Sequence, residues 1–581
     1  MLGKFTQLPT NCERVVFDIE TFDPFLKDTG ASWVRKAGQI LGIGVKIGSS
    51  DTEYYPVGHN SGNYDKDQVK KYINDIWVDS CHGSYPIVGH YLYYDLGWMN
   101  HEGYIDLEWG MKNGLEIFDT LVSSQVYDSS LSAYSLAYMA KHFKVGEKMD
   151  VDVNQLRLMP ISAVERYCCS DVTLTDRVCA RLLEQGNLFA DALDRENNVI
   201  PILIMMHKNG IRIDMEELVN IELRLKKQLK VCMDELLTIE PGIKIWSGTS
   251  IEMLFRKLGL GYPRTDKGNP SFDQDFLEAV GKVNPTIAAM SQARKLHRLI
   301  NNFIFGISRL QVDGILHPDY FNGRSEYGGT VTGRLSSANP NIQQMPNRTE
   351  EGKTIREAFV GFPGEMWSRH DYSQQEPRII LHYASRLALT GIDEWKKRYE
   401  SNPDQDFYNI LMELANRKDR FEMKTMTLAV LYGMGPKRLA TSLGIDENAS
   451  QDLLQLFFKG VPWMKEEREY IMKQVRTNRA VRTLGNRTLR FLPNTDNKAF
   501  NHLIQGSAAD QTKQAMLDVF RQTGKIPLCQ VHDELNYSLN EDEIGQELDV
   551  KIEDIMKNTF SLDFPTKVDS ALGSNWREAC G

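Results

Sequence analysis

Two apolar segments in the C-terminal part of the chain carry carboxylates where strands are expected to end. In residues 526–536, Asp533 and Glu534 stand side by side in a tight turn between apolar runs. In residues 367–376, Asp371 ends another strand-like run. Acidic pairs at strand turns are common on protein surfaces, so neither segment is informative alone. A helix with cationic side chains lies between them, and carboxylates for Mg²⁺ together with cations for a triphosphate predict a nucleotidyl-transfer site.

Size and composition indicate a multidomain globular protein. A chain of 581 residues exceeds what one core supports, and its 41% apolar and 25% charged residues are typical of soluble proteins. The longest apolar run, residues 199–206, contains a proline and is too short to span a membrane, and the N-terminus lacks a signal-peptide pattern. The eight cysteines form no CxxC pair, which argues against zinc and against a disulfide framework. We expect a cytoplasmic protein without membrane association.

The charge distribution is more informative than the net charge of −10, which is unusual for a protein that binds nucleic acid. Residues 473–490 contain six basic side chains and no acidic one, and Arg482 and Arg487 belong to this run. We expect the run to lie along nucleic-acid phosphates. A second basic cluster at residues 224–230 is explained equally well as a solvated helix face.

The N-terminal region alternates strand-like and helical segments, and its acids fit one site. Asp18 and Glu20 share a face of one strand because strand side chains repeat every two residues. Asp95 ends a second segment, and Tyr167 and Asp171 lie one turn apart on a helix. Four carboxylates in one place would repel one another, so two divalent ions about 4 Å apart are expected, with Tyr167 orienting the attacking water.

These acids, in this order, resemble the metal ligands of a DEDDy-type 3′–5′ proofreading exonuclease, which has an RNase H-like fold. Unrelated surface acids are the alternative, and each motif alone is weak. Tyr91 stands where the family usually has Asn. Contacts to the last nucleotide of the primer are therefore expected to differ, while the metal chemistry is retained.

Residues 330–343 read TVTGRLSS, one alanine, and then NPNIQ, which resembles a signature of family A (bacterial DNA polymerase I type) DNA polymerases. The resemblance extends over residues 195–581. It implies that Arg334 reaches the minor groove at the primer terminus. Minor-groove acceptors are nearly independent of sequence, so an arginine there can check base-pair geometry without reading the base.

The segment DYSQQEPR, which begins at Asp371, resembles motif A of this family. The resemblance implies that Asp371 and Asp533 bind two Mg²⁺ ions, with Mn²⁺ as an alternative, and that Tyr372 contacts the nucleotide. It makes Glu376 the steric gate that excludes a ribose 2′-hydroxyl. Pro377 stands where the family usually has Leu, at a position taken as a strand, where it is expected to bend the palm slightly. His532 is expected at the DNA and Glu534 in a supporting role.

The expected fingers helix carries Arg420, Lys424, Leu428 and Tyr432 four residues apart, so all four stay near one face. The resemblance implies that Lys424 binds the α- and β-phosphates and acts as a general acid, that Arg420 binds the γ-phosphate, and that Tyr432 stacks on the template. Leu428 stands where the family usually has Phe or Tyr, which should alter sugar discrimination. Tyr408 is matched to a family histidine, and its hydroxyl can still donate to a phosphate.

A later helix contains the segment QGSAAD, which resembles the QGTAAD segment of the family. Asn501 and Gln505, one turn apart, are expected to contact template and primer near the terminus, and Lys513 is a less specific candidate. The same pattern in isolation would be ordinary helix surface.

The expected architecture is a multidomain α/β protein. An RNase H-like exonuclease domain spans residues 1–190, and a right-hand polymerase domain spans residues 191–581. The latter divides into a thumb (about 191–312), a palm (about 313–405 and 505–581) and fingers (about 406–504). No 5′-nuclease domain is expected, because the chain starts almost at the first exonuclease strand.

The expected substrates are primer–template DNA and dNTPs. We expect a monomeric, phage-encoded enzyme in a bacterial cytoplasm. Helicase, primase or other replisome proteins are its candidate partners. Three alternatives remain. They are a nuclease whose second half only clamps DNA, a non-catalytic DNA-binding scaffold, and a single-subunit RNA polymerase. Asp371, Lys424 and Asp533 disfavour the first, and the two complete carboxylate sets disfavour the second. Glu376 and the expected exonuclease disfavour the third.

Overall fold

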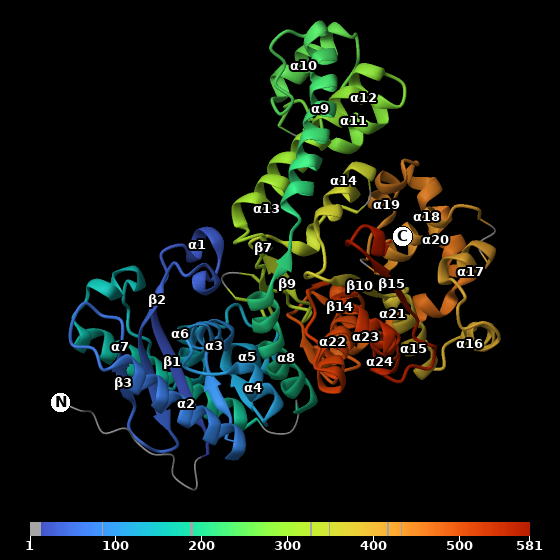
Figure 1. Cartoon of the computed structure of the whole chain (residues 1–581). Coiled ribbons are helices and arrows are strands. Elements are labelled where there is room, and N and C mark those ends of the chain that lie inside the picture. Colours follow the sequence, from blue (N-terminus) through green and yellow to red (C-terminus); the bar gives the residue numbers. More distant parts are fainter. Residues whose placement is uncertain are drawn as a thin grey trace.

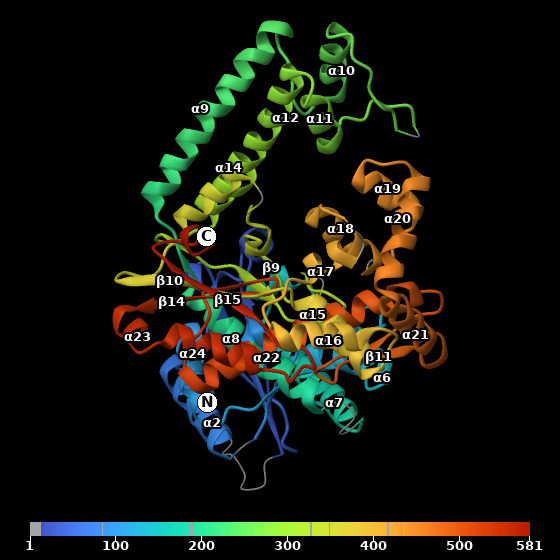
Figure 2. The ribbon, with the colours of Figure 1, turned by 90° about the vertical axis from the view of Figure 1, so that its right-hand side faces the viewer.

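The structure is a computed structural model that describes residues 13–83, 85–185, 190–265, 267–325, 328–347, 349–414, 417–431 and 433–580. Three parts follow one another along the chain: an N-terminal α/β part, a helical arm, and a C-terminal part with a sheet and a cluster of helices (Figure 1). In Figure 2 the sheet lies at the left, the arm rises above it, and the helical cluster lies to the right. Among the described residues, no helix combines the length and apolar character needed to cross a membrane.

The N-terminal part is built on a five-stranded sheet of order β3-β2-β1-β4-β5. The central strand β1 (Val15–Phe22) is antiparallel to β2 (Gln39–Ile47) and parallel to β4 (Ile87–Gly89). Helix α7 (Ile161–Leu183) packs on β1 and β2 through its apolar face. The other elements are β3 (Glu53–Pro56), β5 (Ile117–Asp119), α1 (Leu26–Thr29), α2 (Lys66–Gly83), α3 (Leu92–His101), α4 (Leu107–Lys112), α5 (Thr120–Tyr127) and α6 (Leu136–Phe143).

A long helical segment follows the N-terminal part. Helix α8 (Ala190–Asn209) leads into the long helix α9 (Met215–Ile239), whose start is capped by Asp214 through hydrogen bonds from the backbone amides of Glu216 and Glu217. Helix α9 packs against α12 (Pro285–Arg298), and the tip of the arm has its own apolar core. The remaining arm helices are α10 (Gly248–Lys257), α11 (Gln274–Gly281) and α13 (Phe305–Leu310).

A four-stranded antiparallel sheet of order β13-β14-β10-β15 forms the base of the C-terminal part. Its strands are β10 (Glu365–Tyr372), β13 (Cys529–Val531), β14 (Glu534–Asn540) and β15 (Val568–Gly573). Helices α22 (Ala499–Thr523) and α24 (Leu548–Asn558) pack together beside it. The expected tight turn lies between β13 and β14 and consists of His532 and Asp533, whereas Glu534, also expected in the turn, is the first residue of β14. The short elements β7 (Ile315–Leu316), β8 (Asp319–Phe321), β9 (Ser336–Ala338), α14 (Glu350–Thr354) and α23 (Glu541–Gly545) complete this region, with β6 (Ile211–Arg212) from the arm.

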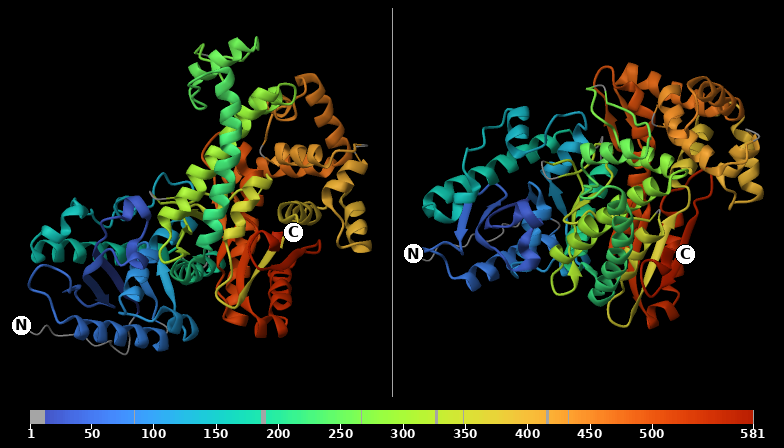
Figure 3. Two further views of the ribbon diagram at one scale, coloured as in Figure 1. Left: turned by 45° about the horizontal axis from the view of Figure 1, so that its top comes forward. Right: turned by 90° about the horizontal axis from the view of Figure 1, so that it is seen from above.

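The remaining helices of the C-terminal part, called the helical cluster, have an apolar core of their own, separate from the core that includes the sheet. Seen from above, the N-terminal part and this cluster lie at opposite ends of the molecule, with the arm between them (Figure 3). Its elements are α15 (Gln375–Arg386), α16 (Ile392–Ser401), α17 (Phe407–Leu414), α18 (Arg420–Leu431), α19 (Pro436–Leu443), α20 (Glu447–Gly460), α21 (Pro462–Asn478), β11 (Ala480–Arg482) and β12 (Thr488–Arg490).

Pro377 lies in the first turn of α15, not in a strand, so the expected bend of the palm strand is wrong. The first backbone amides of a helix have no partner within the helix, so a proline is tolerated there without loss of a hydrogen bond. Strand β10 has already ended at Tyr372.

A buried ionic network joins the base of the arm to the C-terminal part. Glu196 of α8 pairs with Arg487 and, at 2.6 Å, with Lys513 Nζ, and Asp510 pairs with Arg195 at 3.1 Å and with Arg487 at 3.2 Å. All five side chains are almost completely buried. Arg487 therefore lies in the interior rather than along a nucleic-acid backbone, which corrects the interpretation of residues 473–490 as one continuous exposed track. Lys513 is likewise withdrawn from the surface.

Candidate active sites

The end of β10 and the β13–β14 turn bring Asp371 and Asp533 together. The backbone amide of Tyr372 donates to the carbonyl oxygen of Asp533 at 3.2 Å, and Asp371 pairs in register with Glu534. Burial, and then the nearby Asp371, raise the pKa of Asp533 to about 7. Burial also raises the pKa of Asp371 to about 6, against the opposing charge of Arg369. Two neighbouring carboxylates that resist ionisation are suited to a divalent cation.

Arg369 holds the acids of the sheet in position. Its Nη2 donates to Asp371 Oδ2 at 2.6 Å and its Nε to Glu534 Oε2 at 2.7 Å. The other oxygen of Glu534 accepts hydrogen bonds from Trp576 Nε1 and Asn536 Nδ2, both at 2.8 Å. Because these partners occupy both of its oxygens, Glu534 can fix the geometry of the site without binding a ligand itself.

A pocket of about 260 Å³ opens beside Asp533. Arg334 and Glu376 form an ion pair at this pocket, and His532 also lines it. The amide of Gln375 donates to groups of α22, including the Ala508 carbonyl at 3.2 Å, and so anchors the segment that carries Glu376. The sequence predicted Arg334, Glu376, His532 and Asp533 as site residues, and the structure places all four around one cavity.

The start of α18 faces acidic and aromatic neighbours. Arg420 donates to Asp406 Oδ2 at 2.7 Å, and its guanidinium lies 5.0 Å from the centre of the Tyr408 ring. Burial, and then the charge of Glu376, raise the pKa of Tyr408 above its ordinary range. Tyr408 therefore lies near the Glu376 side of the pocket.

The rest of this helix follows the predicted periodicity. Lys424 is exposed, and Leu428 is partly buried against the core of the helical cluster. Tyr432, expected to stack on the template, lies outside the described residues. Leu428 thus contributes to packing, and its contact with the nucleotide stays a prediction.

Of the other predicted contacts, Asn501 and Gln505 are partly buried on α22, and Arg482 is exposed on β11. Tyr372 differs from the expectation. Its ring is buried, and its hydroxyl donates to the Met556 carbonyl of α24 at 2.9 Å. Side chains alternate along a strand, so Tyr372 points away from the face that carries Asp371, which argues against direct contact with a nucleotide.

The predicted acids of the N-terminal part also converge. Asp18, Glu20 and Cys168 each offer a potential ligand atom, and these atoms lie within 4.8 Å of one another. Burial, and then Asp171, raise the pKa of Asp18 to about 7. Burial followed by the charge of Asp18 raises the pKa of both Glu20 and Asp95. We call Asp18, Glu20, Asp95 and Asp171 the N-terminal acid cluster.

Lys148, a residue outside all the predicted motifs, enters this cluster. Its ammonium pairs with Asp171 Oδ2 and lies 4.8 Å from the centre of the Tyr167 ring. Burial lowers the pKa of Lys148, but Asp171 and Tyr167 outweigh burial and raise it overall. The lysine therefore remains cationic against the acids.

Both acid sets fit divalent cations. In the N-terminal cluster, Asp171 Oδ1 is buried and has no hydrogen-bond partner, so one oxygen is available while Lys148 holds the other. In the C-terminal part, Asp533 is half-buried next to Asp371. Carboxylate oxygens are the ligands that Mg²⁺ and Mn²⁺ prefer, and a bound cation offsets the cost of burying these charges.

Sequence reasoning missed Arg369, Lys148 and Cys168. Arg369 could have been found, because it lies two residues before Asp371 and so on the same strand face. Cys168 directly follows Tyr167 within a recognised motif. Lys148 lies in a connection between two helices, where no periodicity relates it to the acids.

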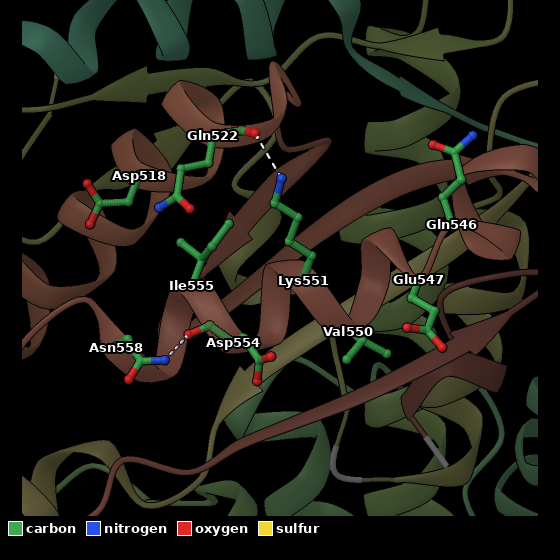
Figure 4. A pocket seen from close by; sticks show the side chains of 9 residues that line it. All are labelled: Asp518, Gln522, Gln546, Glu547, Val550, Lys551, Asp554, Ile555 and Asn558. Atoms are coloured by element: carbon green, nitrogen blue, oxygen red, sulfur yellow. Dashed lines mark hydrogen bonds between the residues drawn. The ribbon is translucent and has the colours of Figure 1, made fainter.

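A hollow of about 450 Å³ lies elsewhere, between α22 and α24 (Figure 4). Its one lysine, Lys551, donates to the backbone carbonyl of Gln522 at 3.2 Å. None of the predicted site residues lines it, and its acids are dispersed: Asp518 lies on α22, Asp554 on α24, and Glu547 just before α24.

The sequence is similar to a known protein family and to individual polymerases. The family model described as DNA polymerase family A matches residues 215–578. A DNA-directed DNA polymerase of Pseudomonas phage M6 is 26% identical over 98% of this chain and 94% of its own length. The thermostable DNA polymerase I of Thermus filiformis is 31% identical over 65% of this chain and 47% of its own length. The chain thus spans nearly all of the phage relative but less than half of the Thermus protein.

A solved structure has a similar fold. It is the POL domain of Pol1 from M. smegmatis in complex with DNA primer-template and dNTP, and the TM-score is 0.80 over 98% of this chain and 97% of that one. The sequence identity is 21%, so this likeness concerns the fold.

Proposed function

The chain belongs to DNA polymerase family A, and on that premise we propose that it is a DNA-directed DNA polymerase that adds deoxynucleotides to the 3′-hydroxyl of a primer. The observation that carries the proposal is the convergence of Asp371 and Asp533 beside a pocket lined by Arg334 and Glu376. The name of the phage relative and the primer-template and dNTP in the similar solved structure support these substrates.

Asp371 and Asp533 hold two Mg²⁺ ions in this proposal, with Mn²⁺ as an alternative. When bound, the ions activate the primer 3′-hydroxyl and neutralise charge on the triphosphate. Arg369 and Glu534 keep Asp371 in place, because each is hydrogen-bonded into the sheet. The primer 3′-hydroxyl loses its proton to solvent as its oxygen bonds to the α-phosphorus, and the bond from the α-phosphorus to the pyrophosphate oxygen breaks.

Lys424 and Arg420 bind the triphosphate from α18. The exposed ammonium of Lys424 binds the α- and β-phosphates and gives a proton to the leaving pyrophosphate. Arg420 exchanges Asp406 for the γ-phosphate, since a guanidinium fork pairs as well with phosphate as with carboxylate. Tyr408 donates its hydroxyl to a phosphate. Glu376, held by Arg334, fills the space that a ribose 2′-hydroxyl would need.

The DNA contacts in this proposal lie around the same pocket. Arg334 and His532 meet the primer terminus, and Asn501 and Gln505 contact template and primer from α22. Arg482, exposed on β11, pairs with backbone phosphates.

We further propose a 3′–5′ exonuclease activity at the N-terminal acid cluster. Asp18, Glu20, Asp95 and Asp171 hold two divalent cations, and Tyr167 orients the attacking water. The supporting observation is that four acids from three distant segments lie close together, with Glu20, Asp95 and Asp171 buried and Asp18 half-buried. Replacing Asp18 by alanine should abolish degradation of a primer in the absence of dNTPs.

Primer extension tests the polymerase proposal. With a single-stranded template of known sequence, the protein should extend the primer only with the complementary dNTP, and Asp533→Ala should lose this activity. Retention of templated extension by Asp533→Ala, with thermal stability unchanged, would place the chemistry elsewhere. A wild-type protein that binds primer–template but never extends it would favour a DNA clamp instead.

A further inference from the structure

Lys148 lies on the open side of the N-terminal acid cluster. Its side chain is 28% exposed, whereas that of its partner Asp171 is 4% exposed. Tyr167, Glu20 and Asp95 are also buried. A DNA end that approaches the acids from solvent would therefore meet the ammonium of Lys148 before it reaches Asp171.

Lys148 is also central to the charge balance of the cluster. It acts on Asp18, Glu20 and Asp171, in each case favouring the ionised carboxylate. Its ammonium also lies over the face of Tyr167, the side chain expected to orient water. Contact with an aromatic face and an acid at once fixes an otherwise flexible side chain.

The ion pair with Asp171 leaves room for a metal ion. Lys148 binds Oδ2, while Oδ1 is buried and has no partner. Asp171 can therefore bind a cation through Oδ1 without releasing the lysine. An ammonium has three N–H donors, and the pair with Asp171 needs only one of them.

We propose that Lys148 is a catalytic residue of the exonuclease site, whose ammonium donates to a non-bridging oxygen of the scissile phosphate. The inference rests on the proposed 3′–5′ exonuclease function. Water oxygen forms a bond to phosphorus as the bond from phosphorus to the 3′-oxygen of the preceding nucleotide breaks. The water loses a proton to solvent, and the released 3′-oxygen takes up a proton. Lys148 keeps its proton and offsets the negative charge that grows on the phosphate oxygens.

A purely structural role makes different predictions. If Lys148 only held Asp171 in place, its removal would weaken metal binding and slow hydrolysis together. If Lys148 binds the phosphate, its removal slows hydrolysis. Metal affinity then stays equal or increases, because the ammonium no longer competes with metal ions for the carboxylates. Metal affinity and turnover thus separate the two roles.

The experiment compares Lys148→Met, which keeps length but removes charge, with Lys148→Arg and with Lys141→Met, an exposed lysine on α6. Primer degradation without dNTPs is measured under single turnover, and dNTP-dependent extension serves as a folding control. Mn²⁺ binding is followed by titration in an Asp533→Ala background, which removes the palm site. Wild type and Asp18→Ala provide the reference values.

We expect Lys148→Met to lose about 10²-fold or more in hydrolysis rate, Lys148→Arg to retain most activity, and Lys141→Met to match wild type. Mn²⁺ binding should be lost in Asp18→Ala but kept in Lys148→Met. Hydrolysis by Lys148→Met within twofold of wild type would overturn the inference, as would Mn²⁺ binding weakened to the level of Asp18→Ala. A wild-type protein without any degradation would instead refute the exonuclease proposal itself.

A sulfur probe gives a second readout. Primers with one non-bridging oxygen of the scissile phosphate replaced by sulfur exist as two stereoisomers. The isomer with sulfur towards Lys148 should be cleaved about tenfold more slowly by wild type, because sulfur accepts hydrogen bonds poorly, and this penalty should shrink in Lys148→Met. An unchanged penalty would also overturn the inference.

Discussion

The two acid sites of this protein are built in different ways. The N-terminal acid cluster takes all its members from one sheet strand and two helices of the same part of the chain. The C-terminal acid site combines Asp371 and Asp533, at the ends of neighbouring strands, with side chains from helices that have a separate core. The geometry of the N-terminal acid cluster is therefore set by packing within one part of the chain. The geometry of the site at Asp371 and Asp533 depends on how the sheet and the helical cluster are placed relative to each other.

Both sites contain a basic side chain that pairs with an acid, but from different sources. Arg369 comes from the same strand as Asp371 and is hydrogen-bonded to two acids. Lys148 comes from a connection between helices and reaches Asp171 from the open side. Arg369 is thus part of the rigid frame, while Lys148 is positioned to meet a substrate.

A buried carboxylate outside the two acid sites, Glu467, differs from the acids of both sites. Glu467 of α21 is completely buried, and neither of its oxygens has a hydrogen-bond partner. Burial alone raises its pKa well above the ordinary value. In the two sites, each acid lies next to other acids with which it can share a cation. Glu467 has no acidic neighbour of this kind among the described residues.

The two acid sites should act independently, so that a substitution in one site affects only the activity of that site. Asp371→Asn should lower templated synthesis by about 10³-fold or more and leave primer degradation within twofold. Asp18→Asn should show the opposite pattern, because its acid cluster is complete within the N-terminal part. Both rates are measured on the same primer–template with and without dNTPs. A variant that loses both activities while its unfolding midpoint is unchanged would contradict separate sites.

The buried network at Glu196 tests how the two parts are joined. Glu196→Ala leaves Arg487 and Lys513 buried without their shared partner, and should lower the free energy of unfolding by about 3–5 kcal/mol. The control is Arg224→Ala, which removes the ion pairs of an exposed arginine with Glu217 and Glu357 and should cost about 1 kcal/mol or less. Urea denaturation measures both. Equal effects would mean that the junction contributes no more than a surface contact.

Glu467 gives a pH-dependent prediction. Its folded-state pKa is raised, so the unfolded chain releases this proton at lower pH, and stability falls as the pH rises above the ordinary glutamate value. Glu467→Gln should therefore become more stable than wild type by on the order of 1–3 kcal/mol between pH 5 and pH 8. Thermal unfolding at several pH values measures the difference. Glu469→Gln, exposed on the same helix, should show no such trend.

Leu428 offers the smallest expected effect. Leu428→Phe places an aromatic ring on the face expected to meet sugar and base, and should shift the preference between deoxy- and dideoxynucleotides by about tenfold or less. Competition between the two nucleotides on one template measures the ratio. An unchanged ratio would mean that Leu428 acts only in the core of the helical cluster.

Much of both sites could be predicted because the relevant patterns are local. Alternation along β1 places Asp18 and Glu20 on one face, and a two-residue turn fixes the position of Asp533. Helical spacing likewise relates Tyr167 to Asp171. The same alternation along β10, applied to Tyr372, would have shown that it faces away from Asp371.

The remaining errors concern partners distant in the sequence. Arg487 belongs to a basic run that predicts an exposed phosphate track, but its partner Glu196 is 291 residues away. Lys148 has no periodic relation to Asp171. A single sequence contains the charges of such pairs but not their proximity, which the packing of whole helices determines.

Diffraction from crystals grown with Mn²⁺, with data collected at the manganese absorption edge, tests most directly whether distant acids form two cation sites. We expect anomalous density between Asp371 and Asp533 and a second set among Asp18, Glu20, Asp95 and Asp171, with Asp171 binding through Oδ1. Crystals that contain manganese elsewhere but show no density between Asp371 and Asp533 when primer–template and dNTP are bound would contradict the proposed polymerase site.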